Sequence, residues 1–396
     1  MRGFIIMKKF TRSTILALTL VAAVGCTKKD TTQNVGATAA TNAASEEIVV
    51  GEVGSMTGSE ATFGTSTHNG IMLAIEQLNA AGGVKGKKFK IVSLDDQGKP
   101  DEAATAVTKL ITQDKIQALL GEVASSRSLA MAPIAQAHGV PMITPSSTNP
   151  KVTEQGDYIF RVCFIDPFQG TVMAKFAAET LKVKNVAVLR DVKNDYSVGL
   201  ANFFTNGFKK LGGNIVVDQS YSAGDMDFKS QLTAIRAKKP EAIYVPGYYT
   251  EVGLIARQAK ELGLNVPLLG GDGWDSPKLN EIGGKSIEGS YFSNHYSPDD
   301  TSPAVQKFVA EYKAKFGIVP DSMAAMGYDA TKVLADAMTR APDLSNAAVR
   351  AAIAATKDFP GVTGVITLNE HRDPVKSAVV LKVASGGYKY QTTVKP

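Results

Sequence analysis

The strongest constraint on the fold is a regular alternation of short β-branched runs with amphipathic segments, which begins at residue 48. Runs such as IVVGEVG, FKIVSLDD and VKNVAVLRD are each followed by a segment with helical periodicity, and THNGIMLAIEQLNAAGG is the first of these. Strands that alternate with helices of about 10 to 15 residues form βαβ units, in which the strands run parallel. The pattern therefore predicts an α/β protein built on parallel sheets.

The alternation falls into two blocks, which are separated by a stretch, 158–170, where the pattern lapses. A chain of 396 residues is too long for one ordinary hydrophobic core, so two domains are expected. We therefore place a crossing between two doubly wound lobes in this stretch. Helices are predicted again in 297–317, 323–340 and 346–356, and SAVVLKVASGGYKYQTTV near the C-terminus indicates a closing hairpin.

The first 25 residues have the pattern of a secretory signal peptide, whether translation starts at Met1 or at Met7. Basic residues precede the apolar run STILALTLVAAVG, which is too short to cross a bilayer. The run ends at Cys26, and AAVGC resembles the box at which bacterial lipoproteins are lipidated. We predict a lipid on Cys26, with a plain secreted protein as the alternative. The polar segment 26–47 then predicts a flexible tether between membrane and domain.

Charge and cysteine content exclude some classes of protein. The predicted leader carries four of the 43 basic residues and none of the 38 acidic ones, so its removal lowers the formal net charge from +5 to +1. This balance gives no indication of a nucleic-acid partner. With Cys26 lipidated, only Cys163 remains, which excludes an intramolecular disulfide. We expect Cys163, in the apolar run YIFRVCF, to be a buried thiol.

Candidate binding residues follow the predicted strands, because open parallel sheets bind ligands beyond the carboxyl ends of their strands. In the first block these positions hold mainly hydroxyl residues, and GEVASSRS supplies more of them than one helix cap requires. In the second block they hold aromatic residues and acids. The candidates are Phe63, Ser125, Ser126, Ser146 and Thr148 in the first block, and Tyr196, Tyr248, Asp272 and Trp274 in the second.

The two sets differ in the chemistry that they offer. Hydroxyls beside helix N-termini suit a carboxylate, whereas aromatic rings and an acid suit a cation with an apolar body. Together they predict a zwitterion held between the two lobes. Each residue also has a structural alternative, namely a helix cap for Ser or Thr, core packing for Tyr, and a turn in GGDG for Asp272. Their coincidence at equivalent strand ends of both blocks favours binding.

The sequence lacks the motifs of common enzymes. It contains no GxSxG, no HExxH and no GxxxxGK[ST], and its histidines occur singly without metal-ligand spacing, at His68, His138, His295 and His371. We therefore expect a binding protein that is not an enzyme and has no metal or cofactor.

Several stretches resemble the periplasmic leucine/isoleucine/valine-binding proteins, which are the solute receptors of branched-chain amino acid ABC importers. They are GEVGSMTGSEATFG, LNAAGGVKGKKFKIVSLDDQGKP, GEVASSRS, VPMITPSSTNP, DYSVGLA and LLGGDG. The resemblance implies a type I periplasmic binding fold whose two lobes are joined by a three-segment hinge. By position, one lobe would comprise 48–163 and 297–376, and the other 164–296 and 377–396. Hinge closure on the ligand would create the form that a permease recognises.

The resemblance also implies roles for the candidates. Ser125 and Thr148, with the backbone of Ser146, would bind the carboxylate of a branched-chain or other apolar amino acid. Asp272 would contact the ammonium group, together with oxygens of Ser146 and Thr148. Phe63, Tyr196 and Tyr248 would form the walls of the side-chain pocket.

This sequence departs from the family pattern at several of these positions. Phe63 lacks the hydroxyl of a tyrosine found in some relatives, Asp272 stands where Glu is frequent, and Ala124 occupies one position of a missing cysteine pair. Trp274 and Tyr249 add bulk near the pocket. A sensory receptor that presents an amino acid, an amide or a small carboxylate to a chemotaxis or kinase partner would have the same pocket, and it remains the alternative to transport.

Overall fold

The computed structural model describes residues 47–396. The predicted signal peptide, Cys26 and all of the predicted tether except Glu47 lie outside the described residues. Within them the α/β pattern is confirmed as two separate sheets, one of five strands in the order β2-β1-β3-β4-β5 and one of seven in the order β14-β13-β10-β9-β8-β6-β7.

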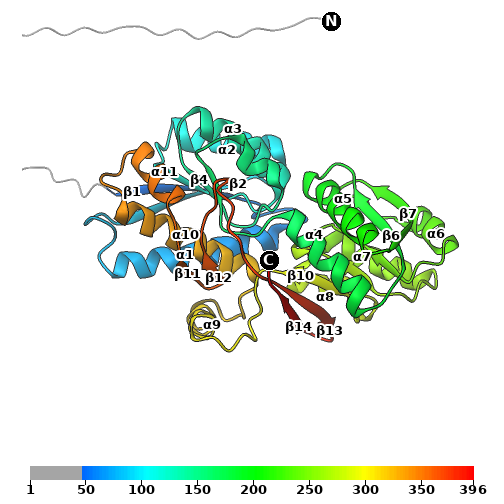
Figure 1. Cartoon of the computed structure of the whole chain (residues 1–396). Coiled ribbons are helices and arrows are strands. Elements are labelled where there is room, and N and C mark those ends of the chain that lie inside the picture. The colour runs from blue at the N-terminus through cyan, green and yellow to red at the C-terminus, as the bar shows by residue number, and fades with distance from the viewer. Residues whose placement is uncertain (1–46) are drawn as a thin grey trace, which may run out of the picture. The chain divides into compact units, whose positions relative to one another are not determined.

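The first sheet is parallel throughout, and helices cover both of its faces (Figure 1). Its strands are β1 (Ile48–Gly54), β2 (Phe89–Asp95), β3 (Ala118–Leu120), β4 (Met142–Thr144) and β5 (Ile159–Arg161). Its helices are α1 (Ala61–Ala80), α2 (Pro100–Thr112) and α3 (Ser125–Ala137), joined later in the chain by α9 (Pro303–Phe316), α10 (Ser322–Arg340) and α11 (Asn346–Ala354). A small hairpin, β11 (Phe359–Gly361) and β12 (Gly364–Ile366), follows α11. We call these elements the first lobe.

The second sheet is parallel from β7 to β10, and an antiparallel hairpin closes it at one edge. Its strands are β6 (Asn185–Asp191), β7 (Asn214–Tyr221), β8 (Ala242–Tyr244), β9 (Leu268–Gly270), β10 (Tyr291–Asn294), β13 (Ala378–Ala384) and β14 (Gly387–Val394). Its helices are α4 (Asp166–Lys175), α5 (Asp195–Lys210), α6 (Lys229–Ala237), α7 (Tyr249–Glu261) and α8 (Pro277–Gly283). We call these elements the second lobe. The hairpin confirms the prediction for the C-terminal segment.

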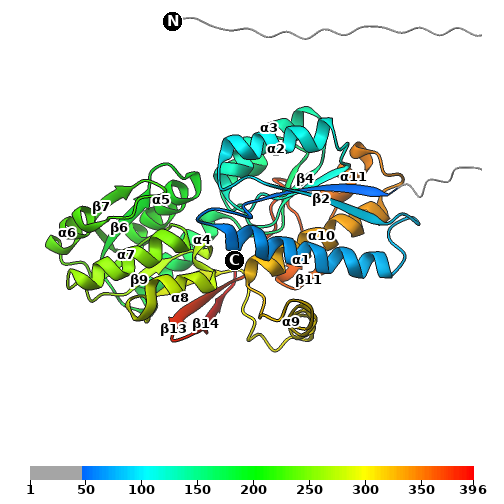
Figure 2. The ribbon, with the colours of Figure 1, turned by 180° about the vertical axis from the view of Figure 1, so that it is seen from behind.

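Alternating strand residues explain why helices cover both faces of the first sheet. Leu119 packs with α2 and α3, whereas its neighbour Leu120 packs with α1 and α10 on the opposite face. Successive side chains of a strand point to opposite faces, so strands as apolar as these require cover on each. The long helices α1 and α10, far apart in sequence, lie side by side in both ribbon views (Figures 1 and 2).

The stretch where the sequence pattern places the crossing between the lobes is more regular than that pattern indicates. The stretch 158–170, where the alternation lapses, contains the edge strand β5 and the first turn of α4. β5 has three residues, which is too few to produce a periodic signal. The chain passes from the first sheet to the second between these elements, returns to the first lobe after β10, and passes into the second sheet again before β13.

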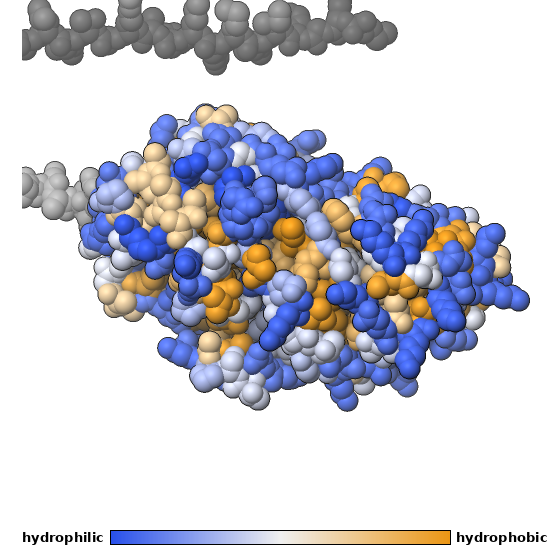
Figure 3. Space-filling model, viewed as in Figure 1, coloured by the Kyte–Doolittle hydropathy of each residue, from blue (hydrophilic) through white to orange (hydrophobic). Residues whose placement is uncertain are grey.

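Two further observations bear on the sequence predictions. Cys163 is a fully buried free thiol, as predicted, and burial raises its pKa to about 12. Among residues 47–396, no helix combines the length and the apolar character that a bilayer crossing requires. The face in Figure 3 has a mostly hydrophilic rim, and hydrophobic residues gather toward its middle.

Candidate functional site

Loops at the carboxyl ends of strands from both sheets meet around a small cavity. The empty space between its walls, counted together with the space that opens to solvent, is about 230 Å³. The residues that line it are Phe63, Val123, Ala124, Ser125, Ser146, Tyr196, Tyr248, Asp272, Gly273 and Met323.

The first lobe contributes the N-terminus of α3 and two hydroxyls. No side chain caps α3, because its N-cap position is Ala124, so the N–H groups of its first turn are available to an anion. Ser125 begins this helix, and its Oγ accepts a hydrogen bond from the backbone N–H of Asn149 at 3.2 Å. The hydroxyl of Ser146 is buried and has no hydrogen-bond partner among the described residues. These groups form the neutral, donor-rich end of the cavity.

A buried arginine fixes the loop that carries Ser146. The Arg161 guanidinium donates to the backbone oxygens of Ser147 and Asn149, the latter at 2.9 Å. Its charge is balanced by Asp373, with 2.6 Å between Nε and Oδ1. Several donors in one rigid group hold several carbonyls in fixed relative positions. Arg161 thereby fixes the backbone next to Ser146, which lines the cavity.

The second lobe contributes the acid. Asp272 is 2% exposed, and each of its carboxylate oxygens accepts one hydrogen bond. Oδ1 accepts from the hydroxyl of Tyr196 at 2.9 Å, and Oδ2 lies 2.9 Å from Nε2 of His295. Its backbone N–H donates to Oε1 of Gln169 at 2.8 Å. The charge of Asp272 faces the cavity, and neither Lys nor Arg is among its hydrogen-bond partners in the described residues.

Two glycines allow the aromatic residues to approach this acid. A Cβ on Gly271 would lie 2.5 Å from the hydroxyl of Tyr196, and a Cβ on Gly273 would lie 2.8 Å from the ring of Tyr248. Real side chains do not tolerate such distances, so the motif GGDG is needed for close packing here as well as for a turn.

Aromatic rings form the wall between the two polar ends. Tyr196 and Tyr248 stack with centroids 5.4 Å apart, and Phe63 meets Tyr248 edge-on at 5.5 Å. Burial raises the pKa of both tyrosines well above the ordinary value, which keeps the two phenols neutral. Tyr249 supports Phe63 from the side, with centroids 5.0 Å apart. The wall is therefore apolar and rigid, as a pocket for an aliphatic side chain requires.

The cavity brings together six of the nine sequence-predicted residues, and three lie elsewhere. Thr148 is fully buried in the same loop as Ser146 but does not line the cavity. Ser126 is partly exposed, and its Oγ both donates to Oδ2 of Asp195, at 3.0 Å, and accepts from the Asp195 backbone N–H, at 2.9 Å. Ser126 therefore connects the lobes and does not line the cavity.

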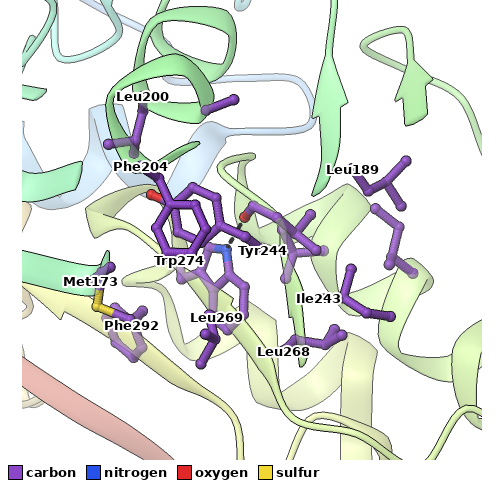
Figure 4. Packing of buried hydrophobic residues seen from close by; sticks show 14 of the residues in the cluster. Met173, Leu189, Leu200, Phe204, Ile243, Tyr244, Leu268, Leu269, Trp274 and Phe292 are labelled. Atoms are coloured by element: carbon purple, nitrogen blue, oxygen red, sulfur yellow. Dashed lines mark hydrogen bonds between the residues drawn. The ribbon is translucent and has the colours of Figure 1, made fainter. Parts of the chain in front are cut away.

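Trp274 also lies outside the cavity, in the core of the second lobe. Its indole is fully buried among Phe204, Tyr244, Leu269 and Phe292 (Figure 4), and Nε1 donates to the backbone oxygen of Val245 at 3.0 Å. The ring fills the space over β9. The sequence placed it with the ligand because it is only two residues from Asp272.

The lining residues Val123, Ala124 and Gly273 lie within two positions of predicted residues, and two further residues at the site were missed by the sequence argument altogether. Met323 lines the cavity from the first turn of α10, a helix that follows no strand, so a search of strand ends does not find it. His295 directly follows β10 and contacts Asp272. Its position after a strand was a usable signal, but only metal-ligand spacing was considered.

Direct contacts between the lobes flank the cavity, so the structure represents a closed form. On one side Asp195 bonds to Ser126, and its backbone oxygen accepts from Nδ2 of Asn149 at 2.9 Å. On the other side the Thr62 backbone N–H donates to the hydroxyl of Tyr249 at 3.3 Å, and the Thr62 and Ser276 hydroxyls are 2.9 Å apart.

We expect Asp195→Ala to weaken ligand binding without any change in the cavity. Its carboxylate accepts one hydrogen bond across the lobes, from Ser126, and one such bond contributes about 0.5–1.5 kcal/mol, which corresponds to a loss of roughly 2- to 10-fold in affinity. Calorimetry measures the affinity, and small-angle scattering measures the extent of closure. Asp227→Ala is the control, since Asp227 is an exposed acid two residues before α6. Equal affinities for the two variants would contradict the closing role of Asp195.

The described residues contain no cluster of His, Cys, Asp and Glu that could hold a metal ion. The donor set of the cavity also fits a small organic zwitterion better than a metal, because hydroxyls and helix N–H groups face a single carboxylate.

The fold and the sequence both match known proteins. A family model described as periplasmic binding protein matches residues 47–388. The Leu/Ile/Val-binding protein homolog 3 of Brucella melitensis is 32% identical over 335 residues, which cover 84% of this chain and 90% of that protein.

Solved structures give the same result. The leucine-binding protein LivK of Thermotoga maritima is 43% identical with a TM-score of 0.85, and the match covers 88% of this chain and 99% of that one. The branched-chain amino acid transporter substrate-binding protein LivJ of Streptococcus pneumoniae, solved in complex with isoleucine, is 34% identical with a TM-score of 0.83 and covers 89% of this chain and 100% of that one.

Proposed function

Because the chain belongs to the periplasmic binding protein family, among its Leu/Ile/Val-binding members, we propose that the cavity binds the zwitterion of a branched-chain amino acid. The protein is a type I, two-lobed substrate-binding protein of a branched-chain amino acid ABC transporter, and its family consists of solute-binding proteins that are not enzymes. What remains to be assigned is how this chain's own residues hold the ligand.

In the proposed complex the ligand spans the two lobes. Its carboxylate accepts hydrogen bonds from the first-turn N–H groups of α3 and from the hydroxyls of Ser125 and Ser146. Its ammonium group lies against Asp272. Its aliphatic side chain packs on Phe63, Tyr196, Tyr248 and Met323, all cavity-lining residues. Thr148, Ser126 and Trp274 are outside the ligand set.

The observation that carries the proposal is the division of polarity across the cavity. The first lobe offers an uncapped helix N-terminus and an unpartnered buried hydroxyl, while the second offers a buried carboxylate. A helix N-terminus attracts an anion, whereas a buried carboxylate attracts a cation. A ligand that bears both charges satisfies each end and draws the lobes together. We propose the sequence-predicted lobes, 48–163 with 297–376 and 164–296 with 377–396, as the bodies that move.

Ligand analogues test this arrangement. We expect leucine, isoleucine and valine to raise the melting temperature, since a ligand at 100 times its Kd stabilises the folded state by about 2.7 kcal/mol. Leucine without its ammonium group (4-methylpentanoate) or without its carboxylate (3-methylbutylamine) should bind at least about 10-fold more weakly, because each loses charge-assisted hydrogen bonds. Equal binding of leucine and 4-methylpentanoate would exclude an ammonium subsite and point to a carboxylate receptor.

We also propose that the mature protein is anchored to the membrane through a lipid on Cys26, as the sequence Ala-Ala-Val-Gly-Cys indicates. The expected result is a membrane-associated mature protein whose intact mass includes acyl chains. Cys26→Ser should release it into the soluble fraction, and an unchanged membrane association of this variant would refute the anchor.

A further inference from the structure

We propose that His295 is a positioning residue, which holds the carboxylate of Asp272 in the orientation that receives the ammonium group of the ligand. This inference rests on the proposed function. It assigns a role to a side chain that does not line the cavity.

The geometry places His295 where the ligand site meets the passages between the lobes. It is the first residue after β10, is 3% exposed, and lies with Nε2 2.9 Å from Oδ2 of Asp272. Its ring stacks on Phe164, in the passage between β5 and α4, with centroids 3.9 Å apart and an interplanar angle of 26°. A ring held on one face and buried around its edge can aim its N–H in only one direction.

The surroundings of the ring determine which nitrogen carries the proton. An unprotonated Nε2 would set a lone pair against the oxygens of Asp272, so Nε2 must be the donor. Nδ1 has no hydrogen-bond partner among the described residues, which is the state of a bare acceptor nitrogen. Burial is the main cause that lowers the pKa of His295 below 6.5, so the ring is neutral at neutral pH. A neutral donor orients Asp272 and leaves its negative charge intact.

Asp272 needs two donors to keep a fixed orientation. The terminal torsion of an Asp side chain is soft, so a single hydrogen bond would leave the carboxylate free to rotate. Tyr196 holds Oδ1 and His295 holds Oδ2. With both in place, the remaining lone pairs of the carboxylate keep one direction toward the cavity.

Protonation of His295 would weaken the binding of a cationic ligand. The charged groups that act on the ring are Asp272 and Asp275, which raise its pKa, and Lys376, which lowers it, and burial exceeds all of them. Below this lowered pKa the ring becomes cationic, neutralises Asp272 and repels an ammonium group. Leucine affinity should therefore be constant at neutral pH and fall only below this lowered pKa, which itself lies below 6.5, the ordinary value for histidine.

Calorimetric titration with leucine tests the role in wild-type protein, His295→Gln and His295→Phe, from about pH 8 to about pH 5. Gln keeps a nitrogen donor near the place of Nε2, whereas Phe keeps the stacking ring and removes the donor. We expect His295→Phe to bind leucine at least about 10-fold more weakly at neutral pH, as for the loss of a hydrogen bond to a charged group. His295→Gln should recover most of the affinity and lack the loss at acid pH.

The control is His68→Gln, because His68 forms a comparable pair with Glu52 in the first lobe, with 2.7 Å between Nδ1 and Oε2. It should bind leucine as the wild type does. A nitrogen-15 spectrum of the histidine rings gives a readout without ligand. The signals that the wild type shows and His295→Gln lacks belong to His295, and they should show the neutral Nε2–H form. A doubly protonated His295 at neutral pH would overturn the proposal.

The outcomes separate this role from the proposed function. If the wild type binds none of leucine, isoleucine and valine, the proposed function fails. If it binds them and folded His295→Phe binds them equally well, the proposed function stands and the role of His295 is refuted. If His295→Phe does not fold, wild type and His295→Gln decide. A loss of affinity at acid pH in the wild type alone supports the proposal, and an equal loss in both proteins overturns it. If neither protein loses affinity by about pH 5, the nitrogen-15 spectrum decides, and a ring that carries its proton on Nδ1 overturns the proposal.

Discussion

Replacing Asp272 by Asn should weaken the binding of branched-chain amino acids at least about 30-fold, since removing one partner of a buried charge pair costs about 2–5 kcal/mol. Asn has nearly the same shape and its amide oxygen still accepts a hydrogen bond from Tyr196 or His295, so the fold is expected to persist. What disappears is the negative charge that faces the ammonium group. Calorimetry with leucine measures the loss, and circular dichroism verifies the fold.

Asp329→Asn is the matched control for this change. Asp329 is as buried as Asp272, but its carboxylate binds the backbone N–H and the hydroxyl of Thr363 in the first lobe, at 2.9 Å and 2.6 Å. This substitution should lower stability and leave the affinity per folded molecule unchanged. If Asp272→Asn binds leucine as tightly as the control does, the ammonium subsite lies elsewhere and the proposed mode of binding is wrong.

The largest effect on stability is expected from Trp274→Ala, which should lower the free energy of unfolding by about 3–5 kcal/mol. The indole is fully buried, packs against Phe292 with centroids 6.0 Å apart, and donates to Val245. Alanine would leave a cavity in the second lobe and an acceptor without its donor (Figure 4). Urea unfolding of the ligand-free protein, followed by circular dichroism, measures the change.

Trp274→Phe separates a packing role from contact with the ligand. Phenylalanine fills most of the space and lacks only the N–H and part of the ring, so stability should fall less than in Trp274→Ala, and leucine affinity should change by no more than a few-fold. A large loss of affinity in Trp274→Phe at near-normal stability would show that the sequence-based assignment of Trp274 to the ligand site was right.

The location of the candidate site was accessible from the sequence because the strands that lead to it are parallel in both sheets. In such sheets the loops after the strands gather at one edge, and Ser125, Ser146 and Asp272 could be selected by their place in the chain alone. Phe63, Tyr196 and Tyr248 were found in the same way. Met323 was not, since it reaches the cavity from a helix that returns to the first lobe late in the chain.

The direction in which each loop residue points was not accessible. Ser125 and Ser126 are adjacent and chemically alike, yet one lines the cavity and the other bonds to Asp195 across the lobes. Successive residues of a helix differ by about 100° in direction, and the phase is set by how α3 packs on its sheet. His295 is a similar case, because its value as a donor depends on Asp272, which is 23 residues away in sequence.

The amino-acid order by itself determined the α/β class, the parallel sheets, the buried thiol and the edge at which polar groups collect, because these follow from local periodicity and from the short range of turns and caps. Only the tertiary structure decided which of those groups face one cavity, which join the lobes and which fill the core. Those outcomes depend on packing between segments that are distant in sequence, where a rotation of one residue along a helix exchanges a ligand contact for a structural one.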